Sequence, residues 1–578
     1  MLKGLLARVV AEPIAQRRFD TILEPICKNK RKLGLAISGG VDSMALASLC
    51  KHVRIFNMPP VTAFIVDHRL RSESTKEAES VAKLLGTLGI QHKILTLDWK
   101  DIQNPAKLSN LESVARRMRF KALGKACADA DIEALLLAHH ADDQAETVLS
   151  RIREGYLGTG LAGISPRSPI GECHGMYRVS RSGTPRDLHQ AKRDTPVFAE
   201  SGGVVIYRPL LDFTKAELVA TCETRNMKWH EDATNADRTL TSRNAIRHML
   251  QSRAMPAALS SDHLRRLATQ SRANLDASEE TATEMFKLCK VELDIVTSSV
   301  SFTIDPSIES WLHRETSPQL TAAKLVRKFF SLSEDSSKVT FQNLAKSVAF
   351  LFPSIMENKL QTNTSVVHLG YVGLRRAPST QRHGLDDHSK FIIFPRPVQN
   401  PADFAKPLLE VTESTQSTSR EPRWTETHIF HDRWWIRLRY VPADVTVGTC
   451  VMVRFLCKRD IAALRRNDAP LSTYAPGNIR YSIPAIVEVI QTKNKRGGTS
   501  TKESIMALPS LGWTRKGQWL SKITVVPMRF TCRYKDVEFS TSENHTVKLS
   551  PLSTAHLDSE STLIPPIPNE LSSAEGHC

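Results

Sequence analysis

Short apolar runs alternate with longer helical patterns over the first 250 residues of the chain. The runs LGLAI, VTAFIVD, HKILTLD and ALLLAHH lack the polar alternation of a half-exposed strand, which is typical of strands buried on both faces of a parallel sheet. The segments between them, such as STKEAESVAKLLGTLG and NLESVARRMRFKALGKACADA, carry apolar residues at helical spacing. We therefore predict an α/β domain with a doubly wound parallel sheet over residues 25–255.

The hydrophobic pattern changes inside and after this domain. Residues 166–203 show no hydrophobic period and are rich in Pro, Gly, Ser and charge, so we expect a long, mobile insertion. Residues 256–375 carry helical patterns, and residues 376–425 have the polar composition of a linker. Runs such as WWIRLRY then predict a small β-rich C-terminal domain over 426–540, and we expect a disordered tail over 541–578.

The N-terminal segment, residues 1–24, is basic and partly apolar. Its first 18 residues place several apolar side chains on one helical face beside four basic residues and a single acid, Glu12. This pattern fits either a short organelle-targeting helix or the first helix of the domain. No run in the chain approaches the ~20 apolar residues of a membrane span, so we expect no membrane partner.

The charge and the cysteines narrow the choice of partner. The chain has 78 lysines and arginines against 61 aspartates and glutamates, a formal charge of +17, which favours a polyanion and above all nucleic acid. Its ten cysteines are scattered, with no CxxC pair. This spacing argues against a disulfide framework and against a zinc or iron–sulfur site.

A glycine-containing turn, SGGVDS, follows the first predicted strand at residues 38–43. Ligands of a parallel sheet collect where strands lead into helix N-termini. There, the glycines would let a phosphate approach the backbone, although SGG is also frequent in plain turns. The loop lacks the lysine of the common NTPase loop. Asp42 would be repelled by phosphates unless it holds magnesium or a cationic substrate.

An acidic motif, AHHADDQAET, follows the fourth predicted strand at residues 138–147. On a helix, His139, Asp143 and Glu146 would project from one face, and two carboxylates there would form a receptor for an ammonium group. Two alternatives stay open. The motif could be the solvated acidic start of a helix, or His139, His140 and Asp143 could bind a metal.

Five motifs in order resemble the N-terminal domain of the tRNA(Ile)-lysidine synthase family. They are SGGVDS, VDHRLR (66–71), NLESVARRMRF (110–120), AHHADDQAET, and RPLLDFTKAEL with WHEDATNADRTLTSRNAIR (208–247). The resemblance covers roughly residues 25–250 and implies an adenine-nucleotide α-hydrolase-like fold. Two departures stand out: REGYLGTGLAGI replaces the family's RGxG stretch, and the C-terminal half is divergent.

The resemblance implies a carbon–nitrogen ligase that uses ATP and Mg²⁺. The enzyme adenylates the C2 oxygen of the wobble cytidine in an isoleucine tRNA with a CAU anticodon, and free lysine then attacks C2 and displaces AMP, so that the tRNA reads AUA. The cytosine must leave its stack to react, and a base must take a proton from the lysine ammonium. For that base our hypothesis is His139 or His140. The Arg- and Trp-containing WWIRLRY run is a candidate RNA surface, or an edge strand with one packed face.

The resemblance assigns roles to matching positions. The predicted catalytic residues are Asp42, His139, Asp143, Glu146, Arg116 and Arg243. ATP is expected at Ser38, Gly39, Gly40, Val41, Asp42 and Ser43, with Asp42 also the magnesium ligand. Lysine is expected at Asp143 and Glu146, and contacts with tRNA or phosphate at Arg119 and Arg247.

Other functions fit parts of the sequence. A sister enzyme that thiolates tRNA cytidine would use the same adenylation, but such enzymes often hold an iron–sulfur cluster on a CxxC pair. GMP or NAD synthetases act on small molecules and need no strongly basic chain. An inactive RNA-binding homologue is a third alternative. The expected compartment is the mitochondrion in a eukaryote and the cytoplasm in a bacterium, and a homodimer is one option for the assembly.

Overall fold

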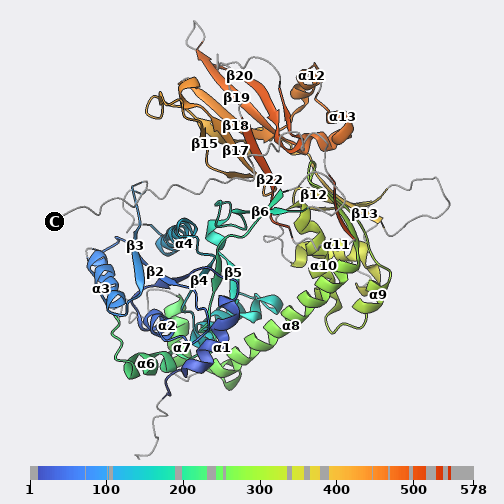
Figure 1. Cartoon of the computed structure of the whole chain (residues 1–578). Helices are drawn as coiled ribbons and strands as arrows, with labels where there is room; N and C mark the ends of the chain where they lie inside the picture. Colours follow the sequence, from blue (N-terminus) through green and yellow to red (C-terminus); the bar gives the residue numbers. More distant parts are fainter. Residues whose placement is uncertain are drawn as a thin grey trace, which may run out of the picture. The chain divides into compact units, whose positions relative to one another are not determined.

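The chain divides into two compact units (Figure 1). The first contains Met1–Pro185 and Glu200–Ala282, and the second contains Arg186–Ala199 and Thr283–Cys578. The computed structural model describes residues 11–71, 73–100, 102, 108–188, 198–230, 242–251, 255–334, 341–356, 365–377, 390–445, 447–466, 469–493, 499–515, 529–537 and 544–548. Residues 1–10 of the N-terminal segment 1–24, predicted as a first helix or a targeting helix, lie outside this part.

The first unit is built on one sheet with the strand order β3-β2-β1-β4-β8-β5. All neighbours in it are parallel except β5, which runs antiparallel to β8. The strands are β1 Leu33–Ile37, β2 Val61–Asp67, β3 Gln91–Thr96, β4 Ala134–Leu136, β5 Arg167–Pro169 and β8 Val205–Tyr207. The predicted doubly wound parallel sheet is confirmed, and its first four strands coincide with the apolar runs.

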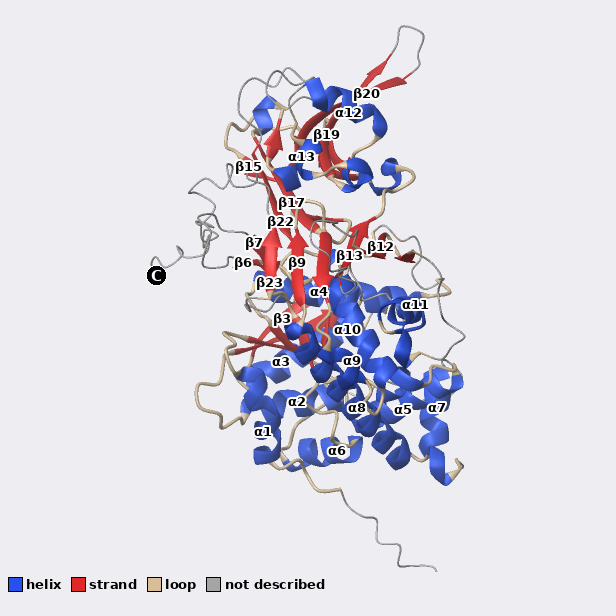
Figure 2. Ribbon diagram, turned by 90° about the vertical axis from the view of Figure 1, so that its right-hand side faces the viewer, coloured by secondary structure: helices blue, strands red, loops and turns tan. Residues whose placement is uncertain are grey.

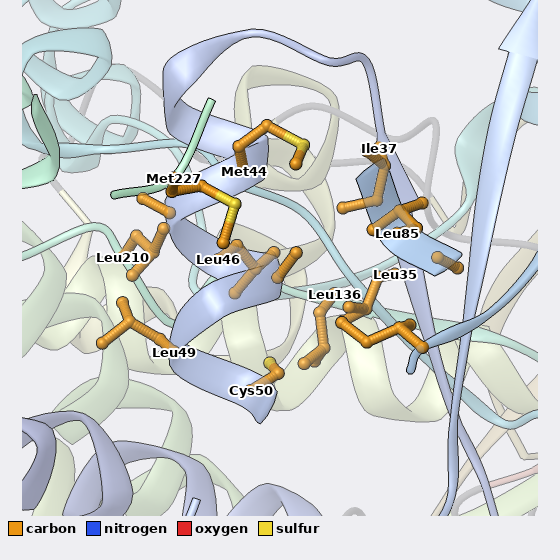
Figure 3. Close-up of a cluster of buried hydrophobic side chains, with 14 of the residues drawn as sticks. Leu35, Ile37, Met44, Leu46, Leu49, Cys50, Leu85, Leu136, Leu210 and Met227 are labelled. Carbon is orange, nitrogen blue, oxygen red and sulfur yellow. The ribbon is translucent and has the colours of Figure 1, made fainter. Parts of the chain in front are cut away.

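Helices cover both faces of this sheet, because successive strand residues point to opposite sides. Leu136 belongs to a core with α1, α2, α3 and α6 (Figure 3), whereas the adjacent Leu135 packs with α4. The helices are α1 Gln16–Cys27, α2 Val41–Lys51, α3 Ser74–Thr87, α4 Leu111–Asp129, α5 Ala141–Arg153, α6 Lys215–Thr224, α7 Ser242–Gln251 and α8 Ser261–Leu288.

The insertion over residues 166–203 differs from the expected mobile loop. Its described part contains β5, β6 (Thr184–Asp187) and β7 (Phe198–Ser201), and buried Ile170, Cys173 and Val179 pack beside α4. A Cβ on Gly124 of α4 would lie 2.7 Å from Cys173 Sγ, so glycine permits this close approach. The insertion has no hydrophobic period because these apolar residues are irregularly spaced, yet they suffice to anchor it.

The second unit consists mainly of antiparallel strands, shown in red in Figure 2. One sheet has the order β11-β12-β13-β10-β9-β23, another β14-β18-β19-β20-β21, and a third contains β15, β17 and β22, with β16 also paired to β17. The strands are β9 Lys290–Asp294, β10 Ser299–Thr303, β11 Val366–Leu369, β12 Val372–Arg376, β13 Lys390–Pro395, β14 Lys406–Glu410, β15 Arg423–Trp424, β16 His428–Phe430, β17 Trp434–Tyr440, β18 Thr449–Phe455, β19 Pro484–Lys493, β20 Thr499–Leu508, β21 Trp513–Thr514, β22 Arg529–Tyr534 and β23 His545–Lys548. Its helices are α9 Ser307–Leu312, α10 Pro318–Ser333, α11 Phe341–Leu351, α12 Lys458–Arg466 and α13 Leu471–Tyr474.

Three regions of the second unit depart from the expected secondary structure. The segment 256–375, expected to be mostly helical, also holds β9 to β12, and the expected linker 376–425 holds β13 and β14. Residues 545–548, in the expected disordered tail, pair with β9 as β23. These strands are short, and their apolar residues pack against elements distant in sequence, which a local pattern does not reveal. The domain limits themselves stay predictions.

Candidate active site

The SGGVDS motif forms the turn between β1 and α2, at the carboxyl end of a central parallel strand. Ser43 Oγ closes this turn: it accepts hydrogen bonds from the N–H groups of Ser38 and Gly39, both at 3.2 Å, and donates one to Gly40 O at 2.9 Å. The N–H groups in the first turn of α2 have no partner within a helix and carry a partial positive charge. The turn therefore presents donors suited to a phosphate.

Gly39 cannot be replaced without strain. Its φ of +86° lies in the region that favours glycine, and a Cβ at this position would lie 2.5 Å from Val81 Cγ2. Its carbonyl also accepts a hydrogen bond of 2.9 Å from His230 N. The turn is thus fixed from two sides by residues far away in sequence.

The acidic motif forms the first turn of α5, which begins at Ala141 with His140 as its N-cap. His140 Nδ1 accepts a hydrogen bond from Asp142 N at 3.2 Å, and Asp143 Oδ2 accepts one from His140 N at 3.1 Å. This reciprocal capping explains why the helix starts here. It also corrects the predicted helical face, because His139 precedes the helix and does not share a face with Asp143 and Glu146.

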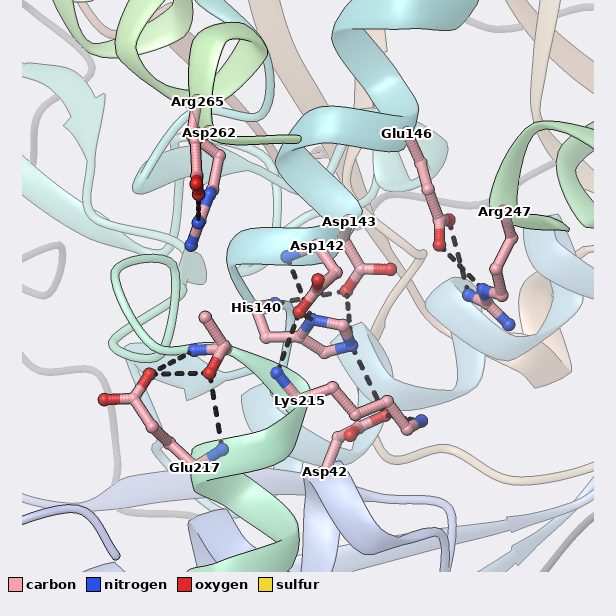
Figure 4. Close-up of polar contacts among 11 residues, drawn as sticks. Asp42, His140, Asp142, Asp143, Glu146, Lys215, Glu217, Arg247, Asp262 and Arg265 are labelled. Carbon is pink, nitrogen blue, oxygen red and sulfur yellow. Dashed lines mark hydrogen bonds and ion pairs between the residues drawn. The ribbon is translucent and has the colours of Figure 1, made fainter. Parts of the chain in front are cut away.

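A partly buried acidic cluster joins the SGGVDS turn to α5 (Figure 4). His140 Nε2 lies 3.7 Å from Asp42 Oδ2 and 3.6 Å from Asp143 Oδ2. Lys215, the first residue of α6, places Nζ 3.4 Å from Asp42 Oδ2 and donates its backbone N–H to Asp142 Oδ2 at 2.8 Å. His140 and Asp143 are buried, and three carboxylates, those of Asp42, Asp142 and Asp143, lie beside Lys215 and His140 in this cluster.

The acidic cluster shifts the pKa values of its members. Burial by itself lowers the pKa of His140, but the hydrogen bond to the Asp142 carboxylate and the charges of Asp143 and Asp42 outweigh it, so that the pKa is raised. Burial raises the pKa of Asp142, yet the hydrogen bonds from His140 and from Lys215 N bring it down to about 2. The histidine of the cluster is therefore a ready acceptor of a proton.

Glu146 lies one turn further along α5 and faces a different partner. Its two carboxylate oxygens accept hydrogen bonds from Arg247 Nε at 2.7 Å and Nη2 at 3.3 Å, and its side chain is 4% exposed. Figure 4 shows Glu146 directed to Arg247 of α7, and Asp143 directed to His140. The two carboxylates predicted to bind lysine together thus have separate contacts.

His139 and Arg116 are positioned by residues of the 208–218 motif and of the insertion. Arg208 Nε donates to His139 Nδ1 at 3.2 Å, and its Nη1 donates to Ser165 O at 2.8 Å. Burial, together with the nearby Arg116, lowers the pKa of Arg208 to about 10. Arg116 itself donates to Glu172 of the insertion at 2.8 Å.

Arg119 and His68 lie near the carboxyl end of β2. The guanidinium group of Arg119 is 5.1 Å from the centre of the Phe120 ring. Burial and the charge of Arg119 lower the pKa of His68, against the opposing effect of Asp67. Arg119 thus contributes positive charge near the edge that carries the SGGVDS turn, since β1 and β2 are parallel neighbours.

Among the described residues of this site, Asp42 has a side chain that fits a metal. Its Oδ1 is buried, and no hydrogen-bond partner for it exists among the described residues; carboxylate oxygen is the donor that Mg²⁺ prefers. The described ranges contain no group of three or more His, Cys, Asp or Glu residues placed to hold a metal. The alternative of a metal site at His139, His140 and Asp143 therefore finds no support.

Sequence reasoning missed Lys215 and Arg208. Lys215 had a signal: a lysine in the first turn of a helix opposes the helix dipole, which suggests an acidic neighbour from elsewhere. Arg208 begins the RPLLDFTKAEL motif, but no local pattern shows its partner, because its contact with His139 spans 69 residues. Of the predicted residues, Arg243 lies in α7, but its side chain is outside the described part, as are residues 231–241.

Residues 11–254 match the family described as PP-loop domain. This range contains the SGGVDS turn and the acidic cluster, so the prediction of an ATP-using PP-loop domain is confirmed.

Curated relatives of this PP-loop domain are lysidine synthases. The chain is 36% identical over 228 residues to a protein named probable tRNA(Ile)-lysidine synthase from Schizosaccharomyces pombe, covering 39% of this chain and 45% of that protein. It is 35% identical over 258 residues to the tRNA(Ile)-lysidine synthase of Methylobacterium nodulans, covering 45% and 64%. The chain thus spans about half to under two thirds of the length of these relatives, and the predicted similarity to this family is confirmed over the PP-loop domain.

One solved structure similar to the chain is the U34-tRNA thiolase NcsA from Methanococcus maripaludis with its [4Fe-4S] cluster. The likeness covers 45% of this chain and 77% of that chain, at 18% identity and a TM-score of 0.32. In the described part of the chain, we find no helix with the length and apolarity that crossing a membrane requires.

Proposed function

We propose that this chain is a tRNA(Ile)-lysidine synthase, which uses ATP to join lysine to C2 of the wobble cytidine in an isoleucine tRNA with a CAU anticodon. One observation supports the proposal most strongly: Asp42 of the PP-loop turn lies beside the buried side chains of His140 and Asp143. An excess of carboxylates next to a phosphate site suits a reaction between an activated nucleotide and an alkylammonium.

In the first step the cytosine O2 attacks the α-phosphorus of ATP, and the bond to the bridging oxygen breaks to release pyrophosphate. Such transfers depend on placement and on positive charge more than on covalent help. The N–H groups at the start of α2 would hold the phosphates, and Arg116 and Arg119 would offset the charge on the leaving group.

In the second step the ε-amine of lysine attacks C2, and the C2–O bond breaks so that AMP departs with the oxygen. The ammonium form of lysine must first lose a proton. We assign this proton to His140 rather than His139, because His140 lies against two carboxylates that would hold the incoming cation. This choice narrows the prediction made from sequence.

Lys215 supports binding of an alkylammonium at this cluster. Its Nζ lies 3.4 Å from Asp42, and half of its side chain is exposed. The chain thus provides an internal example of the group that a substrate lysine would bring. We infer that the lysine ammonium binds at Asp42 and Asp143, and that Glu146 joins them only if it exchanges its contact with Arg247.

Asp42 would also bind the magnesium ion that accompanies ATP. The orphaned, buried Asp42 Oδ1 is the oxygen that would hold Mg²⁺. When bound, the ion would neutralise charge on the phosphates.

The decisive experiment incubates the purified chain with ATP, magnesium, radiolabelled lysine and an isoleucine tRNA transcript with a CAU anticodon. We expect label in the RNA only when ATP is present. A methionine tRNA with the same anticodon is the matched control and should stay unlabelled. If the RNA takes label from a sulfur donor and none from lysine, the thiolation alternative replaces this proposal.

The compartment stays a prediction. A mitochondrial location rests on the basic, apolar residues of the N-terminal segment, and a fusion of the full chain to a fluorescent protein tests it in a eukaryotic cell. Uniform cytoplasmic fluorescence would contradict the prediction.

A further inference from the structure

The third sheet of the second unit has two chemically different faces. Paired residues of antiparallel strands point to the same side, and alternate residues point to opposite sides. Trp434, Ile436 and Leu438 of β17 are therefore on one face, and Arg437 and Arg439 are on the other.

The first of these faces is the packed one. Ile436 and Leu438 are 0% and 1% exposed. Trp434 Nε1 donates to Ile295 O at 3.1 Å, and Tyr534 of β22, which is opposite Trp434, donates its hydroxyl to Leu332 O at 2.8 Å. This side of the sheet is occupied by the core of the second unit, so it is not available to a partner.

The other face combines arginines with an aromatic ring. Arg439 is opposite Trp424 of β15, and Arg437 is opposite Thr531 of β22. The guanidinium group of Arg437 lies 4.3 Å from the centre of the Trp424 ring, and its Nε donates to Thr531 at 3.3 Å. Arg533 of β22 is opposite Trp435. We call the residues Trp424, Arg437, Arg439, Thr531 and Arg533 the arginine face.

The arginine face is accessible at one end and closed at the other. Trp435 is 2% exposed, whereas Trp424 is 39% exposed, a high value for a tryptophan. Arg437, Arg439 and Arg533 are partly exposed. The open end is therefore the one that carries the tryptophan and Arg439.

Charge and ring chemistry together select the partner. Three arginines on one face attract a polyanion, and the acids nearest to them in sequence, Asp432, Asp444 and Asp536, lie outside the strands. A partner held by charge alone would not need an exposed indole. Bases of single-stranded or looped RNA stack on aromatic rings and guanidinium planes, while arginine binds their phosphates. A protein partner would offer neither a continuous line of phosphates nor flat bases.

We propose that the arginine face binds looped or single-stranded RNA, and, on the basis of the proposed function, that this RNA is the tRNA substrate. The PP-loop relatives match less than half of this chain, and the arginine face lies wholly in the second unit. Phosphate contacts contribute an affinity that falls as the salt concentration rises. Stacking of a base on Trp424 contributes an affinity that does not depend on salt in this way.

The test measures binding of fluorescent tRNA to the full chain at two salt concentrations. Arg439→Glu should weaken binding about tenfold and reduce its salt dependence, as expected for a lost phosphate contact. Trp424→Ala should weaken binding about tenfold with the salt dependence unchanged. Arg396→Glu is the matched control, because Arg396 is exposed, follows β13 in another sheet and carries the same charge change. It should bind as the wild type does.

Urea unfolding of each variant distinguishes a loss of tRNA binding from a loss of folding. If Arg439→Glu unfolds the chain, Arg439→Gln replaces it in the binding test. Wild-type affinity in both Arg439 and Trp424 variants that are folded would overturn the proposal and leave the stacking of Arg437 on Trp424 as a contact within the sheet. An equal loss in the Arg396 control would also overturn it. The proposed function is tested separately. If the wild type binds tRNA through the arginine face but forms no lysidine, the proposed RNA surface stands and the proposed reaction is wrong.

Discussion

The two units each contain a partly buried group of charged side chains, and the two groups differ in the balance of acids and bases. In the second unit Arg454 forms a two-pronged ion pair with Asp460, at 2.8 and 3.0 Å, and Glu503 joins it to Arg459. Two arginines face two acids. In the first unit Asp42, Asp142 and Asp143 share Lys215 and His140. In these contacts of the described residues, acids therefore outnumber bases by three to two in the first unit.

This difference in charge balance distinguishes a structural ion pair, in the second unit, from a ligand-binding site, in the first unit. In the balanced group each acid increases the pKa of Arg454, against the effect of burial, so the charges stabilise one another. In the acidic cluster Asp42 keeps a buried oxygen without a hydrogen-bond partner in the described part, and such a group lowers stability unless a ligand joins it. Removing a charge should thus harm function in the first unit and folding in the second.

The largest effect is expected for Asp42→Asn. It removes the charge that would hold magnesium and the lysine ammonium, so lysidine formation should fall about a hundred- to a thousandfold, the range for a lost electrostatic contact in a transition state. Single-turnover transfer of labelled lysine measures it. The free energy of unfolding should not fall. Asp98→Asn, at an exposed acid, is the control and should keep full activity; a destabilised Asp42 variant would contradict the comparison.

Asp460→Ala should show the opposite behaviour. It leaves Arg454 buried without its main partner, and breaking a buried pair in this way costs about 3–5 kcal/mol of unfolding free energy. Urea unfolding measures the loss, and lysidine formation per folded molecule should stay unchanged. Asp403→Ala, at an exposed acid, should lose little. Equal stability of the two variants would show that the balanced group does not stabilise the fold.

Arg247→Gln tests whether Glu146 belongs to the lysine-binding site together with the acidic cluster. The variant frees the Glu146 carboxylate from its two-pronged contact, so that the carboxylate can reach an ammonium, and the KM for lysine should fall several-fold while the KM for ATP stays the same. Steady-state kinetics with Arg247→Lys as the charge-preserving control measures this. An unchanged KM for lysine would remove Glu146 from the lysine site.

The smallest effect is a pH dependence of stability due to His140. Its pKa is raised in the folded chain, so the folded state holds the proton more tightly than the unfolded chain, whose histidines titrate near ~6.5. This stabilisation is complete below that pH and is lost as the pH rises through the raised folded value. His140→Asn keeps an N-cap acceptor and should remove this decline from the urea-unfolding curves. If the free energy of unfolding declines by the same amount with rising pH in the wild type and in His140→Asn, a group other than His140 is responsible.

The sequence predicts the core of the first unit well because its strands are buried on both faces. Such strands are continuous apolar runs, visible without any tertiary information. The site was predicted to the level of motifs. Which histidine faces the carboxylates depends on where α5 begins, and a helix start is uncertain by one or two residues in sequence. This uncertainty is the reason why the predicted catalytic residues included His139, whereas the structure places His140 beside the carboxylates.

The remaining differences arise from contacts between distant residues. Lys215 reaches Asp42 across 173 residues, and β23 pairs with β9 across more than 250. No local pattern encodes such contacts. The arginine face is intermediate: WWIRLRY predicts alternation, but Trp424 joins Arg437 only through the pairing of β15 with β17.

The most direct test of the central claim is mass spectrometry of the nucleosides from the tRNA after reaction with ATP and isotope-labelled lysine. Lysidine carrying the label at the wobble position, formed by the wild type and lost in Asp42→Asn, is the predicted result. Unmodified cytidine or 2-thiocytidine at that position with the wild type, or labelled lysidine formed at the wild-type rate by Asp42→Asn, would contradict it.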